Sequence, residues 1–226
     1  TISGGEILDA ATLVRQNFER HAGPRLGQFD TVNINHVNTS TTSQNLKQLG
    51  LAMHNFADTY RRFPVSEYPE SSFDVNGKNH LSWRVYLLPF LGYSNLFQQF
   101  RLNEAWNSPT NLALLDQMPD LFRSSGDAST SNSTRLQVLT GPDALFGRDL
   151  YNGRQVGPGL QTIIDGFSNT ILIVEVGADR AVPWTAPDEV IFDAANPLAA
   201  LGTLASGELP LLMADGSVMS LGIDVL

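Results

Sequence analysis

Several residue types are missing from all or part of this 226-residue chain. It contains no cysteine, which excludes disulfide bonds, thiol nucleophiles and thiolate metal sites together. Histidine is absent after His80, and lysine is absent after Lys78. The longest apolar runs, such as 85–91 and 171–174, fall far short of the roughly 18 residues that a membrane-spanning helix requires. We therefore expect no membrane span within this chain.

Charge is unevenly distributed along the sequence, although the formal net charge is only −9. Acidic and basic residues balance over 1–113, so the whole net charge lies in 114–226. Arg61 and Arg62 form the only basic cluster, and we expect it to lie at a helix C-terminus rather than to bind an anion. An acidic surface without a basic stripe repels phosphate backbones, which argues against nucleic acid as a partner.

The remaining composition is that of a folded domain. The hydrophobic fraction is 42% and the charged fraction is 16%, which argues against disorder. A chain of this length buries roughly 70% of the surface that it exposes when unfolded, which is enough for a substantial core. We divide it into an N-terminal element over 1–42, with helix, strand and linker signals, and one α+β domain over 43–226.

A long amphipathic helix is the clearest local signal. Its apolar residues recur at steps of three and four and form one stripe: Leu46, Leu49, Met53, Phe56, Tyr60 and Phe63. The sequence predicts a helix over 45–63, with Thr42 or Ser43 as its N-cap and Pro64 at its end. Such a narrow stripe requires a partner surface, either a sheet or another helix.

Shorter elements follow this helix. Three short helices are expected first, at 83–91 after an N-cap at Ser82, at 96–106, and from Ser108-Pro109 toward Pro119. Four strands are expected later, at 136–140, 170–176, 209–214 and 217–223. Asp215 and Gly216 separate the last two strands and predict a two-residue type I′ hairpin turn with positive φ at both positions. Helices followed by strands indicate an α+β fold with an antiparallel sheet rather than an alternating βαβ fold.

Two common catalytic or binding systems find no support. No G-x-S-x-G elbow is present, and the second half has no histidine to activate a serine. Gly157-Pro158-Gly159 resembles the start of a dinucleotide fingerprint, but the third glycine is missing and proline removes a backbone donor. We interpret this segment as a loop before a short helix at 160–164, and we expect no cofactor.

Paired carboxylates are the catalytic alternative, because two of them could flank a glycosidic bond in a glycoside hydrolase. The acidic residues expected near strand ends are Asp165, Glu175, Asp188, Glu189 and Asp215. Asp165 and Asp215 each precede a glycine, and a carboxylate in such a turn commonly bonds its own backbone. Glu175 interrupts an apolar run, so it requires a partner if it is buried. We expect that partner to be Arg180 or a backbone amide.

Any metal site in the acidic half must use oxygen ligands, which suit calcium or magnesium rather than zinc. Asp143, Asp149 and Asn152 cluster in a glycine-rich loop, but their spacing matches no EF-hand, so we expect a solvated loop. His54 lies beside the helix stripe without a second ligand on its face, and we expect it to be a packed residue. We therefore assign no catalytic, cofactor-binding or metal-binding residue.

Five short motifs, in order, resemble one large bacterial family. They are Asn45–Phe56 with Phe63-Pro64, Leu81–Val85 with Leu88-Pro89, Ile164–Ile171 with Glu175, Val182–Thr185, and Ala214–Val218. Together they cover about residues 43–223. The family is planctomycete-type, is catalogued as a domain of unknown function, and often carries a prepilin-type cleavage and methylation leader.

The resemblance implies a pilin-like build, in which a helix packs on an antiparallel sheet. It also implies export and a structural or binding role outside the cytoplasm, in the periplasm or at the cell surface. The family brings no established catalytic residues. We therefore expect a non-enzymatic module whose partners are proteins or extracellular glycans. The alternatives are a carboxylate-based glycan hydrolase and a calcium- or glycan-binding domain.

The chain departs from the family pattern at two places. The C-terminal motif usually has a histidine ten residues before Asp-Gly, where this chain has Ala205. The residues before Ser43 also differ from the unbroken apolar helix of a prepilin. Since the chain begins at Thr1, we expect a processed product or fragment, anchored through a segment that lies outside it.

Overall fold

The computed structural model describes most of the chain from residue 41 onward. The described residues are 41–64, 81–141, 144–147, 150–151, 154–155, 157–193, 196, 198–204 and 207–222. The predictions for the N-terminal element, for Asp143, Asp149 and Asn152, and for Ala205 lie outside these residues.

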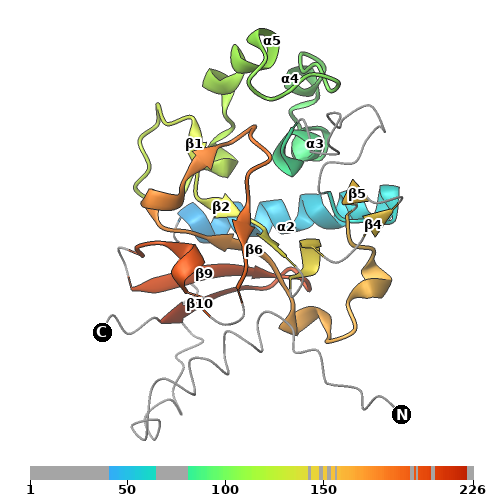
Figure 1. The fold of residues 1–226 in the computed structure, drawn as a ribbon, viewed down its shortest axis with the longest axis vertical. Coiled ribbons are helices and arrows are strands. Elements are labelled where there is room, and N and C mark those ends of the chain that lie inside the picture. Colours follow the sequence, from blue (N-terminus) through green and yellow to red (C-terminus); the bar gives the residue numbers. More distant parts are fainter. Residues whose placement is uncertain are drawn as a thin grey trace, which may run out of the picture.

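Helix α2 (Thr41–Tyr60) lies across one face of the main sheet (Figure 1). Five of the six residues of the predicted stripe are buried, namely Leu46, Leu49, Met53 and Phe56 within the helix and Phe63 after its end. Gly50 faces the sheet, and a Cβ at this position would lie only 2.9 Å from Leu212 Cδ1. The missing side chain thus allows the helix to approach the sheet closely.

The predicted ends of this helix are wrong. Thr42 and Ser43 already lie within α2, so neither is its N-cap. The helix ends at Tyr60 because Arg61 adopts a left-handed conformation, with φ of 63°, while its N–H still donates to the Ala57 carbonyl. Tyr60 is 39% exposed, although its ring packs 4.5 Å from that of Phe56.

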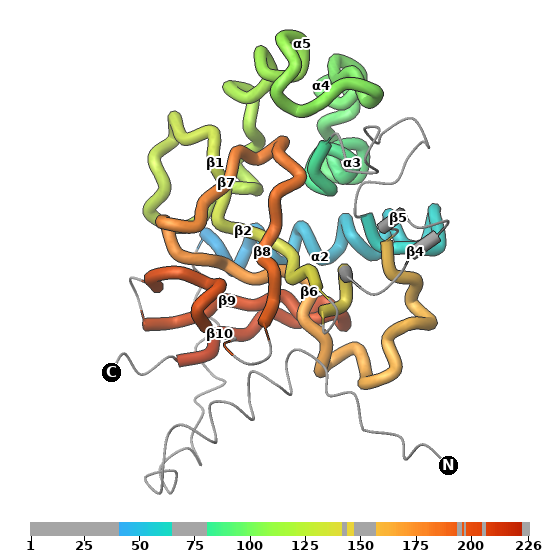
Figure 2. Tube along the Cα trace, viewed as in Figure 1, coloured from blue at the N-terminus to red at the C-terminus, as the bar shows by residue number. Residues whose placement is uncertain are grey.

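The main sheet has four strands in the order β10-β9-β6-β2, and every neighbouring pair is antiparallel. Its strands are β2 (Leu136–Gln137), β6 (Ile171–Glu175), β9 (Glu208–Met213) and β10 (Val218–Gly222). The α+β prediction with its helix-on-sheet arrangement is therefore confirmed. Figure 2 shows β9 and β10 side by side below α2, and α2 meets β9 where Gly50 lies against Leu212.

One predicted strand divides into two. The expected strand at 136–140 separates into β2 and β3 (Leu139–Thr140), and β3 pairs in parallel with β8 (Val190–Ile191). The change of partner occurs at Val138, whose N–H donates to the Glu189 carboxylate at 2.9 Å. A side chain thus takes the place of a neighbouring strand at this position.

The sheet separates two apolar clusters. Leu212 and Ile173 belong to the cluster that α2 covers, together with Trp83, Phe122 and Trp184. Residues such as Leu209, Leu211 and Val174 belong to a second cluster on the other face, with Val190, Phe192 and Leu201. The alternation of neighbouring strand residues between the clusters is the expected period of two.

Several short helices follow α2. They are α3 (Trp83–Leu87), η3 (Leu88–Leu91), α4 (Ser94–Phe97), α5 (Pro109–Leu112), η4 (Leu115–Gln117) and η5 (Asp120–Phe122). Those labelled α3, α4 and α5 lie on the side of α2 away from β9 and β10 (Figure 1). The predicted N-caps are confirmed, since the hydroxyls of Ser82 and Ser108 accept from Arg84 N and Asn111 N.

The helix predicted over 96–106 is wrong, because α4 ends at Phe97. Asn111 explains the difference, since its buried amide organises the following turns. Asn111 Oδ1 accepts from Arg101 N–H, and Nδ2 donates to the carbonyls of Arg101, Glu104 and Ala105. These bonds hold the backbone outside the helical conformation.

The remaining elements are short. They are β1 (Ser133–Thr134), η6 (Leu145–Gly147), β4 (Leu150–Tyr151), β5 (Arg154–Gln155), η7 (Leu160–Thr162), η8 (Phe167–Asn169), η9 (Ala178–Arg180), β7 (Val182–Pro183) and η10 (Ala199–Leu201). Strand β1 pairs with β7, and β4 pairs with β5, both antiparallel. None of the described helices is both long and apolar enough to cross a bilayer.

The C-terminal β9–β10 hairpin is confirmed, but its predicted type I′ turn is wrong. Met213 N–H donates to the Ser217 carbonyl, so the loop between them has three residues rather than two. Of these three, only Gly216 has positive φ, at 83°. Gly216 N–H donates to the Met213 carbonyl, which is the arrangement of a turn followed by a left-handed bulge residue.

Candidate functional site: two arginine–carboxylate clusters

Two of the five predicted carboxylates lie in buried clusters, and each cluster is built around an arginine. Glu189 pairs with Arg84, and Glu175 pairs with Arg135. We call these the Arg84 cluster and the Arg135 cluster. Asp165, Asp188 and Asp215 belong to neither, so the structure does not gather the five acidic residues into one site.

The Arg84 cluster is a two-pronged ion pair within the core. Arg84 is 0% exposed, and its Nη1 and Nη2 donate to Glu189 Oε1 and Oε2 at 2.9 and 3.2 Å. Its remaining donors reach the Leu136 carbonyl, from Nε at 3.1 Å and Nη2 at 2.7 Å, and the Ser82 hydroxyl, from Nη1 at 2.6 Å. The guanidinium carbon also lies 4.8 Å from the centre of the Trp83 ring. The arginine is thus bonded along its whole fork.

This cluster also closes one edge of the sheet. Because Val176 N–H bonds the Arg135 carbonyl, the alternation of an antiparallel pair directs the backbone groups of Leu136 and Val138 away from β6. The Leu136 N–H donates to Thr134 Oγ1, its carbonyl accepts from Arg84, and the Val138 N–H donates to Glu189. Side chains therefore satisfy the backbone groups that β2 would offer to another strand.

Burial and pairing act in opposite directions on the ionisation of this cluster. Burial raises the pKa of Glu189 above its usual value, while the charge of Arg84 and the Val138 N–H oppose that change. Burial likewise lowers the pKa of Arg84, opposed by Glu189. An arginine is not deprotonated in proteins, and a buried unpaired guanidinium would be costly. The pair is therefore ionic at neutral pH.

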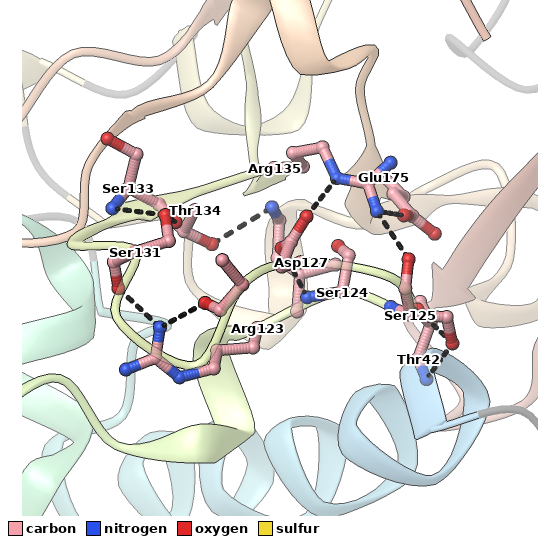
Figure 3. Close-up of polar contacts among 12 residues, drawn as sticks. Thr42, Arg123, Ser124, Ser125, Asp127, Ser131, Ser133, Thr134, Arg135 and Glu175 are labelled. Carbon is pink, nitrogen blue, oxygen red and sulfur yellow. Dashed lines mark hydrogen bonds and ion pairs between the residues drawn. The ribbon is translucent and has the colours of Figure 1, made fainter. Parts of the chain in front are cut away.

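The Arg135 cluster is more accessible and contains two carboxylates (Figure 3). Arg135 Nε donates to Asp127 Oδ1 at 3.0 Å, and Nη2 lies 2.9 Å from Glu175 Oε1. Nη2 also donates to the Ser125 carbonyl at 2.9 Å. The Arg135, Asp127 and Glu175 side chains are 17%, 15% and 9% exposed, so one cation holds two anions near the surface.

Burial is the largest influence on the pKa of Glu175, which it raises above the usual value. The charge of Arg135 opposes this change, as do interactions with the hydroxyls of Ser124 and Thr42, whereas the charge of Asp127 adds to it. Arg135 was not the expected partner. The prediction of Arg180 is wrong, because the Arg180 guanidinium donates to the Ala199 carbonyl instead.

The Arg135 cluster joins the sheet to the first described turn of α2 (Figure 3). Ser125 N–H donates to Thr42 Oγ1 at 2.8 Å, and Thr42 N–H donates to Ser125 Oγ at 3.3 Å. Asn45 Nδ2 donates to the Asp120 and Arg123 carbonyls at 3.1 and 2.9 Å. The loop that contains Ser125 therefore lies between the helix and Arg135, and bonds hold it on both sides.

Asp215 lies at the exposed tip of the hairpin, as predicted. Its Oδ1 accepts from the backbone N–H of Ser217 at 2.8 Å, which is the local bond expected of a turn aspartate. The preceding Ala214 N–H donates to the Thr170 carbonyl, and the Asp215 N–H donates to that of Phe167. Asp165 is half-buried and precedes Gly166, whose φ is 93°. Asp188 is exposed.

The motifs that resemble a family meet in pairs in space. Ser82 N–H donates to the Thr185 carbonyl, which joins the second motif to the fourth. The bonds from Ala214 and Asp215 to 167–170 join the third motif to the fifth. Trp184 is fully buried and donates through Nε1 to the Leu115 carbonyl. The motif residues thus hold distant segments of the fold together.

Two other predicted candidates have structural roles. The Gly157-Pro158-Gly159 loop packs against the chain after α2, because Phe63 N–H donates to the Pro158 carbonyl. A Cβ on Gly157 would overlap the Phe63 carbonyl oxygen, so the glycine permits this close approach. His54 packs edge-on against Phe63, with ring centroids 5.7 Å apart, as expected of a packed residue.

Among the residues that the structure describes, no group of three histidine, aspartate or glutamate side chains is placed to hold a metal ion. The arginine partners were missed by sequence reasoning. Arg84 could have been found, because a charged residue within the otherwise apolar 81–91 segment requires a buried partner. Arg135 offered no comparable signal.

Comparison with known protein families identifies the chain. Residues 40–200 match the family described as Protein of unknown function (DUF1559), which is more than half of the sequence. The chain therefore belongs to this family, as the five motifs indicated. Searches among curated proteins and among solved structures find no match.

Proposed function

We propose that this domain is a non-catalytic structural or binding module that acts outside the cytoplasm. The observation that carries the proposal is the engagement of its buried carboxylates by arginines and backbone amides. Both oxygens of Glu189 accept hydrogen bonds from protein donors, and Glu175 faces Arg135. These side chains are used within the fold.

The requirements of glycoside hydrolysis support this choice over the hydrolase alternative. That reaction needs two carboxyl groups on either side of a glycosidic bond, one of them protonated to serve as the acid. Glu189 is ionic and enclosed by donors, and Asp215 bonds the Ser217 N–H at the end of a hairpin. Neither environment favours proton transfer to a substrate.

An extracytoplasmic location is the second part of the proposal. It is supported by the family resemblance, whose members often carry a prepilin-type leader, and by the helix-on-sheet arrangement that the resemblance implies. The natural test is to fuse a reporter that is active only after export to the complete gene product. Reporter activity supports the proposal, and a reporter confined to the cytoplasm overturns it.

An assay for polysaccharide hydrolysis tests the proposal that the domain is not catalytic. Reducing ends released from a panel of bacterial and plant polysaccharides would be measured for the chain, for Glu175→Gln and for the control Glu104→Gln, whose half-buried side chain lies outside both clusters. We expect release at the level of buffer for all three. Turnover by the unchanged chain and by Glu104→Gln that is lost in a folded Glu175→Gln variant would establish the hydrolase instead.

A further inference from the structure

The two edges of the main sheet differ in how their backbone groups are satisfied. At the β2 edge, the Arg84 cluster and Thr134 occupy the outward backbone groups. At the other edge, β10 pairs with β9 on one side, and no described strand pairs with its other side. Among the described residues β10 is therefore an edge strand, and such an edge is a template for pairing with another strand.

The register of the hairpin identifies the groups that β10 offers. Met213 N–H bonds the Ser217 carbonyl, so by alternation Met219 and Leu221 also direct their backbone groups toward β9. The N–H and C=O groups of Val218, Ser220 and Gly222 therefore point away from the sheet. These three residues alternate along the strand, so they present a regular outward ladder.

The composition of β10 leaves this ladder open. The strand Val218–Gly222 contains no charged residue, no proline and no bulge, which are the usual means of protecting an edge. Met219 is 37% exposed, and Gly222 is exposed. Because the chain carries a net charge of −9, a strand without charged residues of its own avoids placing further acidic side chains between two copies.

We propose that β10 is a self-association surface, which pairs antiparallel with β10 of a second copy about a two-fold axis at Ser220. In this register Ser220 lies opposite Ser220, Val218 opposite Gly222, and Met219 opposite Leu221. All three outward residues then fall in hydrogen-bonded pairs, so the strand is complementary to itself over its full length. The contact extends the sheet across both copies.

This inference rests on the proposed structural role and names one of its partners. A five-residue strand forms a small interface, so we expect weak, concentration-dependent association. Repulsion between two acidic copies predicts that the association strengthens as ionic strength rises. The mass in solution should move from 24.6 kDa toward about twice that value as the concentration increases.

The absence of cysteine permits a direct test of the register. Paired residues in an antiparallel ladder lie about 5.5 Å apart at Cα, which is within the range of a disulfide. Ser220→Cys in the full chain should therefore give a covalent dimer under mild oxidation. Leu51→Cys is the matched control, because Leu51 is 65% exposed and belongs to α2 rather than to β10. It should give at least tenfold less dimer at the same concentration.

A charge at the same position provides an independent readout. Ser220→Lys would place two like charges opposite each other on the axis of the dimer. The Ser220 hydroxyl contacts the Glu208 carboxylate, so Glu208 offers the new lysine a partner within its own chain. We expect a folded monomer at concentrations where the unchanged chain and Leu51→Lys associate. The inference is overturned if the unchanged chain stays monomeric at all salt concentrations. It is also overturned if the two cysteine variants cross-link equally. Either result leaves the polysaccharide and export tests of the proposed function unaffected.

Discussion

The Arg84 cluster and the Arg135 cluster use the same chemistry at different depths. Arg84 is 0% exposed and binds one carboxylate with both prongs, whereas Arg135 is partly exposed and binds two carboxylates with one contact each. The first satisfies the outward backbone groups of β2, and the second connects the sheet to the start of α2. Arg84 lies within the core and Arg135 at its margin, whereas the Glu189 and Glu175 side chains are equally exposed, at 9%.

This difference shows that burial determines how much each bond contributes to the stability of the fold. Solvent can replace a lost partner at the margin, but nothing replaces it in the core, where an uncompensated charge is strongly destabilising. Arg84 accordingly has a protein partner on every nitrogen of its fork. We therefore expect the stability of the fold to depend far more on the Arg84 cluster.

The largest effect is expected from Glu189→Gln. Gln would present an N–H₂ group to the Arg84 guanidinium or the Val138 N–H, which leaves a buried cation without its counter-charge. We expect a loss of about 3–5 kcal/mol in the free energy of unfolding, measured by urea denaturation. A loss below about 1 kcal/mol would contradict the account of the Arg84 cluster.

Arg135→Met should have a smaller effect. It removes the bonds to Asp127, Glu175 and the Ser125 carbonyl, and leaves two carboxylates that water can partly solvate. We expect a loss of about 1–3 kcal/mol in the same experiment. The matched control is Arg101→Met, an exposed arginine, which should change the free energy by no more than about 0.5 kcal/mol.

The pH dependence of Glu175→Gln sharpens the comparison within the Arg135 cluster. The raised pKa means that the folded state binds a proton more readily than the unfolded state, whose value is 4.5. The contribution of Glu175 to stability is thus fully present below pH 4.5 and is lost as pH rises through the folded pKa. The unfolding free energy of the unchanged chain, relative to Glu175→Gln, should therefore fall as the pH rises over that window. A rise would mean that Arg135 outweighs burial.

The smallest effect on stability is expected at Asp215, which is an exposed carboxylate. Asparagine has an equivalent oxygen to accept from the Ser217 N–H, so Asp215→Asn should alter the free energy of unfolding by no more than about 0.5 kcal/mol. Gly216 requires its positive φ, and Gly216→Val supplies the comparison in the same turn, with an expected loss of about 1–3 kcal/mol. A large effect of Asp215→Asn would indicate that this carboxylate has a role beyond the turn.

The parts of the fold that depend on local periodicity were predictable. The apolar stripe of α2 and the strands β6, β9 and β10 each repeat within a few residues, and the structure has them nearly where expected. The type of turn between β9 and β10 could not be predicted in this way. It depends on Ala214, whose N–H donates to the carbonyl of Thr170, a residue distant in sequence. The false helix at 96–106 failed for the same reason, since Asn111 fixes that backbone from outside it.

The clusters could be predicted only in part, because their partners are distant in sequence. Arg84 and Glu189 are 105 residues apart, and only the folded topology brings them together. The need of Glu175 for a partner was correctly inferred, since a carboxylate in an apolar strand cannot remain unpaired. The choice between Arg135 and Arg180 depended on the pairing of β2 with β6, which periodicity does not specify.

The central claim is that the Arg84–Glu189 pair contributes to the fold more than the Arg135–Glu175 pair does. Two double-mutant cycles measured by urea denaturation test it most directly, one with Arg84→Met and Glu189→Leu, the other with Arg135→Met and Glu175→Leu. The account predicts a coupling energy of about 3 kcal/mol for the first pair and about 1 kcal/mol or less for the second. Equal coupling energies, or a larger value for the Arg135 pair, would contradict it.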